Sequence, residues 1–415
     1  MGNALIQLVA VGPQNVMING KPEATLFQSY FKRVTMFAME SVKQTFNGSV
    51  GFGNRVQCQI ARNGDLLSKM VLEVSLPGLD GDTNSTDVTY VDDVGYHLLK
   101  EVELEIGGIS IVKHYGRWMH IWQELTRPAE KDAIHDKMIG NRTDVVPSSP
   151  GEALAAPGKL YVPLQFWFCN NYALAFPLIA CQYHEVKVNI TFENLSTLAR
   201  ANATVTAVNG GADTAISMST PTAVGALSAD LYVDYVFLDN DERRKFATSA
   251  HEYLIEQLQY PSAESHGTTS STFTRRLDGF NHPVKEIVFV LQEDDELVSG
   301  QPSNFANGTA QTVDKSKLIL NGNDRFSERS GEYFNWVQPY FHHSRGPATG
   351  IYVYSFATEP EKHQPTGTCN FSRIDTAQLS ITPLGTLTAV QSHVYMVNYN
   401  VLRLVSGMAG LSFAA

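Results

Sequence analysis

Apolar and polar residues alternate with a period of two along much of this chain, and this pattern restricts the fold more than any other feature. In the segment EVELEIGGISIV, which starts at Glu101, the side chains of Val102, Leu104 and Ile106 fall on one face and three glutamates fall on the other. Residues spaced in this way occupy opposite faces of a β-strand. Antiparallel sheets with one buried and one wetted face produce such alternation, so the sequence predicts a mainly antiparallel β protein.

The same segment predicts a tight hairpin. A Gly-Gly pair follows Ile106, and glycine readily adopts the positive φ angles that a two-residue hairpin turn requires. In the expected register Ile106 faces Ile109 and Leu104 faces Ile111, which keeps one side of both strands apolar. Two further segments, 69–77 and 185–194, alternate likewise, and the side chains predicted to point inward are Met70, Leu72, Val74, Leu76, Val186, Val188, Ile190 and Phe192.

Helical spacing is short and scarce. In the stretch 115–128, Tyr115, Trp118, Trp122 and Leu125 step by three, four and three positions before a proline ends the run. A second helix is predicted at 239–250, where Asp239 or Asn240 is the expected cap and acidic residues occupy the first turn. Both helices would be additions to sheets.

One order of strand types occurs twice. The first half runs KMVLEVSLP, VELEIGG, the Trp118 and Trp122 stretch, LYVPLQFWF, VKVNITF and LYVDYVFLD, and the second half runs VKEIVFVLQ, KLILNGN, Trp336, GIYVYSFA, AQLSITP and HVYMVNYNVLRLV. A chain of 415 residues also exceeds the size of a usual single core. The sequence therefore predicts an all-β fold of two consecutive eight-stranded antiparallel jelly rolls, with short helices and long loops at 141–159, 200–230 and 296–316.

Charge and cysteine usage exclude several classes of protein. A formal net charge of −11 and a pI near 5.5 oppose binding to a phosphate backbone, so no direct contact with nucleic acid is expected. The four cysteines, Cys58, Cys169, Cys181 and Cys369, are widely spaced, as in proteins of a reducing compartment. No basic leader and no apolar run of about 18 residues is found, so neither secretion nor a membrane span is expected.

The segment EPEKHQPTGTCNFSRID, 359–375, offers ionisable side chains that could form a nucleophile and its base, a metal clip or a loop that ties down a strand: His363, Cys369, Arg373 and Asp375. A cysteine nucleophile needs a base in reach and a setting that favours the thiolate, and closeness in sequence shows neither. We expect the structural alternative. Pro365 and Gly367 would shape a loop, Cys369 and Phe371 would pack, and Arg373 or Asp375 would bond to backbone groups.

Other candidates are also expected to be structural. His342 and His343 could join His363 as metal ligands, but adjacent histidines point in different directions and no carboxylate spacing supports them. The basic residues of DERRKF, 241–246, follow acidic ones and are expected on a solvated or interface face. The Trp118 and Trp122 pair is expected in the core or at a subunit interface. The sequence thus predicts no catalytic, cofactor-binding or metal-binding residue.

Several motifs together carry a family resemblance. They are MFAMESVKQTFNG from Met36, RNGDLLSKMVLEVSLP, LDNDERRKFA, HEYLIEQLQ, GTCNFSRID and the terminal NYNVLRLVSGMAGLSF. In this order they resemble the major capsid proteins of large icosahedral nucleocytoplasmic double-stranded DNA viruses with an internal membrane, the algal-virus and iridovirus type. The resemblance spans nearly the whole chain and is weakest in the long loops.

The resemblance implies a structural protein without enzymatic activity or cofactor. A double jelly roll of this type would form a homotrimer, a pseudo-hexagonal capsomer that tiles the outer icosahedral shell of the virion around a membrane and a DNA genome. It implies assembly in the host cytoplasm and a division into an N-terminal contact arm (1–24), a first jelly roll (25–246) and a second (247–415). The partners would be other copies, neighbouring capsomers, minor capsid proteins and the inner membrane.

Two alternatives remain open at this stage, a jelly-roll carbohydrate-binding or carbohydrate-processing protein and a minor capsid or spike component. The chain also contains eight Asn-x-Ser/Thr sequons, at Asn47, Asn84, Asn141, Asn189, Asn194, Asn202, Asn307 and Asn370. Without a signal peptide these are expected to be chance occurrences. The resemblance nonetheless allows covalent glycans on exposed loops such as 300–312, at positions that sequons would not locate.

Overall fold

The computed structural model describes residues 4–80, 87–140, 158–202, 222–294, 302–308 and 310–413. The chain divides into two compact units, Met1–Met36 and Phe37–Ala415. The first unit contains two short helices, α1 (Ala4–Val9) and α2 (Pro13–Asn19), whose apolar side chains are largely exposed. The second unit contains all the strands of the described chain.

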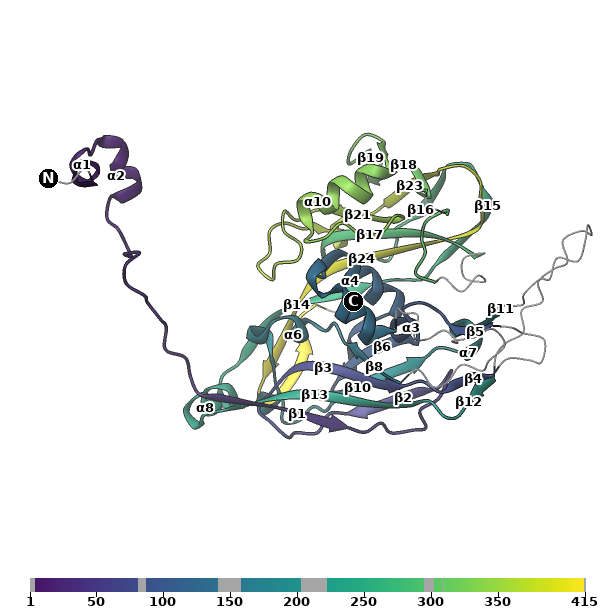
Figure 1. Cartoon of the computed structure of the whole chain (residues 1–415), viewed down its shortest axis with the longest axis horizontal. Coiled ribbons are helices and arrows are strands. Elements are labelled where there is room, and N and C mark those ends of the chain that lie inside the picture. Colours follow the sequence, from purple (N-terminus) through teal and green to yellow (C-terminus); the bar gives the residue numbers. More distant parts are fainter. Residues whose placement is uncertain are drawn as a thin grey trace, which may run out of the picture. The chain divides into compact units, whose positions relative to one another are not determined.

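The first half of the larger unit, here called the first lobe, consists of two antiparallel sheets that face each other across a shared core (Figure 1). One sheet has the order β1-β13-β3-β8 and the other β2-β10-β6-β7. The bounds are β1 (Phe37–Gln44), β2 (Arg55–Gln59), β3 (Leu66–Ser75), β6 (Leu99–Ile106), β7 (Ile109–His114), β8 (Lys159–Pro163), β10 (Val186–Phe192) and β13 (Ser228–Leu238). Short strands add to these sheets or pair beside them: β4 (Gly78–Asp80), β5 (Asp87–Tyr90), β9 (Phe176–Pro177), β11 (Ala199–Asn202) and β12 (Thr222–Val224).

The second lobe repeats this arrangement. Its sheets have the orders β14-β24-β17-β21 and β16-β23-β18-β19. The bounds are β14 (His251–Gln259), β16 (Phe273–Arg276), β17 (Pro283–Glu293), β18 (Val313–Leu320), β19 (Asn323–Asp324), β21 (Ile351–Ser355), β23 (Ala377–Pro383) and β24 (Leu387–Val405). The additional strands are β15 (Glu264–Thr269), β20 (Arg329–Ser330), β22 (Cys369–Asn370) and β25 (Met408–Leu411).

The two strand orders correspond position by position. In sequence order, the eight main strands of the first lobe take the same places in their two sheets as the eight of the second lobe. Pairing of strands that are distant in sequence, such as β1 with β13 and β14 with β24, is the connectivity of a jelly roll. The predicted double jelly roll and the predicted internal repeat are thus confirmed.

The predicted inward positions are buried. All eight of the side chains assigned inward in β3, in the turn after it and in β10 are at most 3% exposed. The Gly-Gly hairpin is present as well, with positive φ at both glycines. Its register differs from the prediction, because a bulge between Leu104 and Glu105 places Leu104 opposite Val112 and leaves Ile106 opposite Ile109. An extra residue on one strand shifts every pair beyond it, and sequence alternation alone does not locate such a bulge.

Both predicted helices are present. They are α4 (Gly116–Thr126) and α8 (Asn240–Thr248), and Asp239 occupies the cap position of α8. The other helices in the described part of the larger unit are short: α3 (Val94–His97), α5 (Asp132–Ile139), α6 (Trp167–Asn170), α7 (Leu195–Leu198), the π-helical turn η5 (Tyr333–Val337) with α10 (Gln338–His342), and the 3₁₀ turns η1 (Ala129–Lys131), η3 (Tyr172–Leu174), η4 (Leu178–Ala180) and η6 (Phe371–Arg373). The helix α4 lies between the two lobes (Figure 1).

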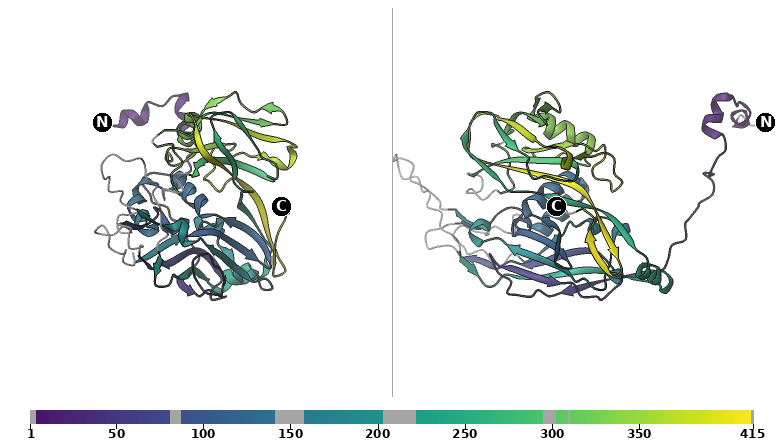
Figure 2. Two further views of the ribbon diagram at one scale, coloured as in Figure 1. Left: turned by 90° about the vertical axis from the view of Figure 1, so that its right-hand side faces the viewer. Right: turned by 180° about the vertical axis from the view of Figure 1, so that it is seen from behind.

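The C-terminal strands connect the lobes a second time. β24 begins in the second lobe and extends past it, so that Leu402 and Leu404 join the core of the first lobe together with Ala409 of β25 (Figure 2). The amide of Tyr183 donates to the carbonyl of Gly407 at 3.0 Å. The end of the chain is therefore part of the first lobe's packing.

The predicted long loops lie mostly outside the described residues. Residues 141–157, 203–221, 295–301 and 309 fall in this category, with the sequons at Asn84 and Asn141. Asn189, in contrast, lies buried within β10, and its side chain donates to Glu105. That position is closed to a glycan in the folded chain.

Candidate functional site

The junction between the lobes brings together aromatic and charged side chains from both lobes. It is built on α4, which begins at Gly116. A Cβ atom at this position would collide with the backbone carbonyl oxygens of Tyr96 and Leu99, so only glycine lets the helix start so close to the first lobe. Met119 then faces the core of the first lobe. The opposite side of the helix is left to face the second lobe.

That opposite side packs on the outer face of the sheet β14-β24-β17-β21. Trp118, Ile121 and Leu125 of α4 share one apolar cluster with these second-lobe side chains: Val288, Val290, Phe305, Ile351, Val353, Tyr395 and Val397. The Trp118 ring lies 5.2 Å from the Tyr395 ring and 5.5 Å from the Trp122 ring, measured between centroids. The predicted core or interface role of Trp118 is thus that of a core between the lobes of one chain, where it is 4% exposed.

A buried lysine lies beneath the second tryptophan. Nζ of Lys285 is 2.8 Å from Oε1 of Glu256 and donates to the carbonyl of Pro360 at 2.7 Å. It also lies over the Trp122 and Tyr399 rings, 5.5 and 5.7 Å from their centroids, which are cation–π distances. A fully buried ammonium group is tolerated here because a carboxylate, a carbonyl and two aromatic faces replace its hydration.

The neighbouring residue on β17 extends this charged cluster. Oε2 of Glu286 lies 3.1 Å from Nε2 of His343, and Nδ1 of the same ring lies 3.0 Å from Oε1 of Glu361. Burial by itself would lower the pKa of His343, but the hydrogen bonds and charges of Glu286 and Glu361 outweigh it and raise the pKa to about 9. The imidazole is therefore protonated at neutral pH and joins the two carboxylates.

A second buried cluster includes His120 of α4. Oδ2 of Asp93 lies 3.0 Å from Nδ1 of His120 and accepts a hydrogen bond from Ser303 Oγ at 3.0 Å. Burial would raise the pKa of Asp93, but its hydrogen bond to His120 and the nearby charge lower it to about 2. The pKa of His120 is raised, because the contact with Asp93 overcomes the opposing effect of burial. Ser303 belongs to the second lobe, so this cluster also ties the lobes together.

Serine, histidine and aspartate side chains meet here, but they are not connected as in a hydrolase triad. Nε2 of His97 is 2.8 Å from Ser303 Oγ, while the Asp93 carboxylate binds that same hydroxyl and His120 rather than the far nitrogen of His97. In a triad the carboxylate orients the histidine that deprotonates the serine. Burial in addition lowers the pKa of His97 to about 3. Such a histidine is a weak base.

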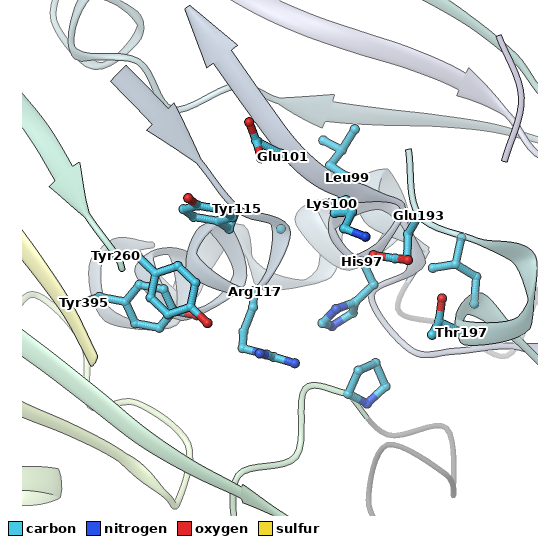
Figure 3. Close-up of a pocket in the computed structure, with 13 residues that line it drawn as sticks. His97, Leu99, Lys100, Glu101, Tyr115, Arg117, Glu193, Thr197, Tyr260 and Tyr395 are labelled. Carbon is cyan, nitrogen blue, oxygen red and sulfur yellow. The ribbon is translucent and has the colours of Figure 1, made fainter. Parts of the chain in front are cut away.

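A cavity of about 400 Å³ opens beside these residues at the lobe junction (Figure 3). Its walls come from both lobes, and the labelled polar side chains include Lys100, Glu101 and Glu193. Arg117 projects between the aromatic rings and His97, and donates to Nε2 of His393 at 2.9 Å (Figure 3). Burial and the positive charge of Arg117 together lower the pKa of His393 to about 2. Positive and negative groups line the cavity in mixture, so it carries no single charge preference.

Ion pairs close the junction at its rim. Arg345 of the second lobe contacts the carboxylate of Asp132 and lies 3.8 Å from Oε2 of Glu124. Arg127 is 2.6 Å from the same Asp132 oxygen and 3.4 Å from Glu124. Arginines from both lobes thus share two carboxylates of the first lobe.

The segment 359–375 forms a loop and a short strand, as the structural alternative predicted. Cys369 lies in β22, opposite Val284 of β17, and Phe371 is buried in the core of the second lobe. Gly367 has φ of +142°, and a Cβ there would press on the carbonyl of Phe356. The side chain of Arg373 or Asp375 was predicted to bond to a backbone group. In the structure the backbone amide of Asp375 instead donates to the side-chain Oδ1 of Asn321 at 3.0 Å.

The surroundings of the four cysteines do not favour the thiolate form that a nucleophile requires. All four cysteines are free, and burial raises their pKa values, to about 11 for Cys58 and about 12 for Cys169. Burial likewise raises the pKa of Cys369. A thiol with a raised pKa is a poor nucleophile at neutral pH.

The adjacent histidines separate as expected. Nδ1 of His342 is 3.0 Å from the carbonyl of Thr358, whereas His343 binds the two carboxylates described above. Throughout the described ranges, no group of three or more His, Cys, Asp or Glu side chains is placed to hold a metal ion. In the DERRKF segment, Arg243 pairs with Asp65 at 3.0 Å and the remaining helix surface is largely exposed. No helix in the described parts is long and apolar enough to cross a bilayer.

Sequence reasoning did not identify the buried charges. Lys285 and Glu286 interrupt an otherwise apolar strand, VKEIVFVLQ, and this interruption was the available signal. No such interruption marks Asp93 in the sequence, and its unusual φ of +53° is seen only in the structure. The partners of Lys285, Glu286 and Asp93 come from six separate segments, namely α4, β14, β24, the end of α10, 302–308 and 359–375, so no local pattern links them.

Comparisons with known proteins agree with this architecture. A family described as "Major capsid protein N-terminus" matches residues 25–239, and one described as "Large eukaryotic DNA virus major capsid protein" matches residues 242–410. The major capsid protein of Pyramimonas orientalis virus is 41% identical over the full length of both chains, and that of Paramecium bursaria Chlorella virus 1 is 39% identical over the full length of both.

Solved structures show the same relationship. A chain of the PBCV-1 virus capsid in a quasi-atomic model is 35% identical with a TM-score of 0.77, and the match covers 94% of this chain and all of that one. The Faustovirus major capsid protein shares the fold with a TM-score of 0.75 at 13% identity, over 97% of this chain and 96% of that one. With two jelly rolls of equal strand order, and with family matches that together span residues 25–410, the chain belongs to the major capsid proteins of large eukaryotic DNA viruses.

Proposed function

We propose that three copies of this chain form a pseudo-hexagonal capsomer that tiles the outer shell of an icosahedral virion. The observation that supports the proposal is the equal strand order of the two lobes. Three chains with two similar lobes each present six similar sides around a three-fold axis. Such a tile packs in a flat lattice although the ring itself has only three chains. A closed ring of this kind uses head-to-tail contacts between unlike surfaces.

The lobe junction gives the tile its stiffness. A tile keeps its shape only if its two lobes do not hinge, and here α4, the C-terminal strands and the rim ion pairs each connect them. The buried aromatic contact resembles a domain core more than the polar interface of mobile domains. In this proposal the charged clusters hold the lobes in one arrangement and perform no catalysis.

The proposal extends to the surroundings of the tile. The shell encloses a membrane and a DNA genome and is assembled in the host cytoplasm. Residues 1–24 act as a contact arm towards the membrane or minor capsid proteins, residues 25–246 and 247–415 form the two jelly rolls, and exposed loops carry any covalent glycans. Contacts within the trimer are large and apolar, whereas contacts between tiles are weaker and more hydrated, so that a wrongly placed tile can dissociate again.

Light scattering on the purified full chain tests the proposal. A trimer has a mass of about 137 kDa, three times the chain mass of 45.8 kDa. The trimeric mass should persist on dilution to micromolar concentration, as obligate assemblies do. A strictly monomeric species under these conditions would contradict the proposal. Electron microscopy of the trimer would then show whether its outline has six lobes.

A further inference from the structure

The outer side of the helix η5–α10 in the second lobe is not covered by any part of the chain that the structure describes. Phe334 packs into the core of its own lobe, and Asn335 donates to the carbonyl of Ile351 at 2.8 Å. The opposite side carries Trp336, Tyr340 and Phe341, which are 58%, 80% and 70% exposed. Trp336 and Tyr340 are four positions apart and so lie on one helix face, and the Phe341 ring lies 5.1 Å from the Tyr340 ring between centroids. Large aromatic side chains gathered in this way on a surface mark a contact site.

The helix that takes the same place in the first lobe is covered. α4 follows β7 as η5–α10 follows the matching strand of the second lobe, and each leads into the edge strand of a sheet, β8 or β21. The outer side of α4 packs on the sheet β14-β24-β17-β21 of the other lobe. The chain itself therefore shows which surface this kind of helix binds, namely the outer face of a four-strand sheet in the next lobe.

Register identifies the matching face on the first lobe. In the covered sheet Val288 lies between Tyr395 and Val353 on the neighbouring strands. In the first-lobe sheet β1-β13-β3-β8, Val71 lies between Tyr232 and Pro163. The two triplets hold the same places in their sheets. Two residues further along, Val290 lies opposite Ile351, and Glu73 lies opposite Tyr161.

The matched positions differ in exposure. Val288, Val353 and Tyr395 are at most 1% exposed beneath α4. Val71 and Tyr232, in contrast, are only half-buried, and Tyr161 is 39% exposed. Within the described ranges these first-lobe positions are therefore less covered than their second-lobe counterparts, although Glu73 is 8% exposed. One face of each kind is thus left open, the outer face of a helix and the outer face of a sheet.

The open sheet face has a chemistry that suits aromatic side chains. Its charges are paired within the lobe, Lys159 with Glu73 at 2.6 Å and Lys43 with Asp230 at 2.7 Å. Lysines held on such a surface attract the faces of aromatic rings, and Lys69 already lies 4.9 Å from the Tyr172 ring centroid. The two open faces lie at opposite ends of the two-lobe block, α10 at one end and β1 and β13 at the other (Figures 1 and 2). The two open faces of a single chain therefore cannot contact each other, and a contact between two such faces requires another copy.

We infer that η5–α10 of one copy docks on the outer face of the sheet β1-β13-β3-β8 of a second copy, as α4 docks on the second lobe within the chain. This inference rests on the proposed trimer and assigns its contact surfaces. The helix contributes Trp336, Tyr340 and Phe341, and the sheet contributes Val71, Tyr161 and Tyr232. The result is a head-to-tail contact that alternates with the internal junction around the ring.

Substitution on the helix tests the inference. The double variant Tyr340→Asp/Phe341→Asp places two carboxylates in the contact, and because both side chains are exposed it should keep the fold of the single chain. We expect the concentration at which half of the trimer dissociates to rise by more than about tenfold in light scattering, since central aromatic residues dominate interfaces. Tyr161→Asp on the sheet should act in the same direction. Leu384→Asp, at a residue 43% exposed outside the proposed contact, is the matched control and should leave the mass unchanged.

A cross-linking experiment keeps the inference testable if a variant folds poorly. A benzophenone amino acid at position 340 of the otherwise unchanged chain should, on irradiation, join two chains, with cross-links in 66–75, 159–163 or 228–238 of the other copy. Cross-links elsewhere, or a double variant as trimeric as the wild type, would overturn the docking inference while the trimer stands. A monomeric wild type would instead overturn the proposed function.

Discussion

Nε2 of His343, at the end of α10, lies 3.1 Å from Oε2 of Glu286 on β17, and both side chains are completely buried. The second ring nitrogen reaches Glu361, in the segment 359–375. The ionisable residue of that segment with a clear structural role is therefore Glu361. It joins a helix, a strand and a loop through one protonated imidazole.

The His343 ion pairs should make stability depend on alkaline pH. The pKa of this histidine is raised from about 6.5 when unfolded to about 9 when folded, so its contribution is present in full below about pH 6.5 and is lost as the pH rises through 9. We expect His343→Gln to lower the unfolding free energy by roughly 1–3 kcal/mol at pH 6.5. The difference from wild type should shrink towards pH 9.5.

Chemical denaturation followed by circular dichroism at pH 6.5, 8 and 9.5 measures this. His342→Gln is the matched control, because the His342 ring contacts the backbone carbonyl of Thr358 and not a carboxylate. A His343→Gln deficit that stayed constant across the three pH values would show that the ring is held by packing alone.

Removal of Trp118 should weaken the lobe junction. Truncation of a buried tryptophan to alanine typically costs about 3–5 kcal/mol, because a cavity is left between groups that cannot collapse. Trp118→Ala should therefore lower the melting temperature strongly, and Trp122→Ala should do so through lost contact with Lys285 and the neighbouring ring. Ile134→Ala, at a residue 65% exposed, should melt within error of wild type. If both tryptophan variants melted like wild type, the junction would not be a stabilising core.

The Asp93 cluster should show the opposite pH dependence. The pKa of Asp93 is depressed to about 2, so the stability from its contacts is present above about pH 4 and is lost as the pH falls towards 2. Asp93→Asn removes the charge and leaves His120 without its carboxylate, which typically costs about 3–5 kcal/mol for a buried pair. Asparagine is the appropriate replacement, because it tolerates the φ of +53° found here.

Denaturant midpoints at pH 7 and pH 3 would test this expectation. The deficit of Asp93→Asn should be largest at pH 7 and clearly smaller at pH 3. Asp136→Asn, at a half-exposed carboxylate whose pKa is raised mainly by burial, serves as the control and should not lose stability at pH 7. An Asp93→Asn deficit that grew on acidification would contradict the depressed pKa.

The thiols should react slowly in the native protein. Because burial raises the pKa of each cysteine, the thiolate fraction at pH 8 is small and access is restricted. A thiol reagent such as dithiobisnitrobenzoate should label the four cysteines rapidly only after urea is added. Rapid stoichiometric labelling of one residue in the native chain, Cys369 above all, would reopen the nucleophile hypothesis.

Local patterns predicted the elements well because each depends on near neighbours. Alternation along β10 and the three-four-three spacing in α4 are decided by which side chains share a face, and both elements were placed correctly. The Gly-Gly turn was predicted correctly because it also depends on neighbouring residues, two glycines that adopt positive φ. The pairing of Leu104 failed because a bulge inserts a residue that alternation does not reveal. The resemblance supplied the family, and the repeated order of strands supplied the double fold.

By itself, the sequence determined the strands, the short helices and the internal duplication, since these follow from the order and periodicity of residues, and its motifs carried the resemblance to a capsid family. Only the tertiary structure decided that Trp118 seals two lobes of one chain, that Lys285 and Glu286 are buried together with His343, and that the helix η5–α10 is left open while α4 is covered. These relationships join residues that lie up to hundreds of positions apart. Burial and charge pairing act through space, and no local pattern fixes which distant side chains will meet.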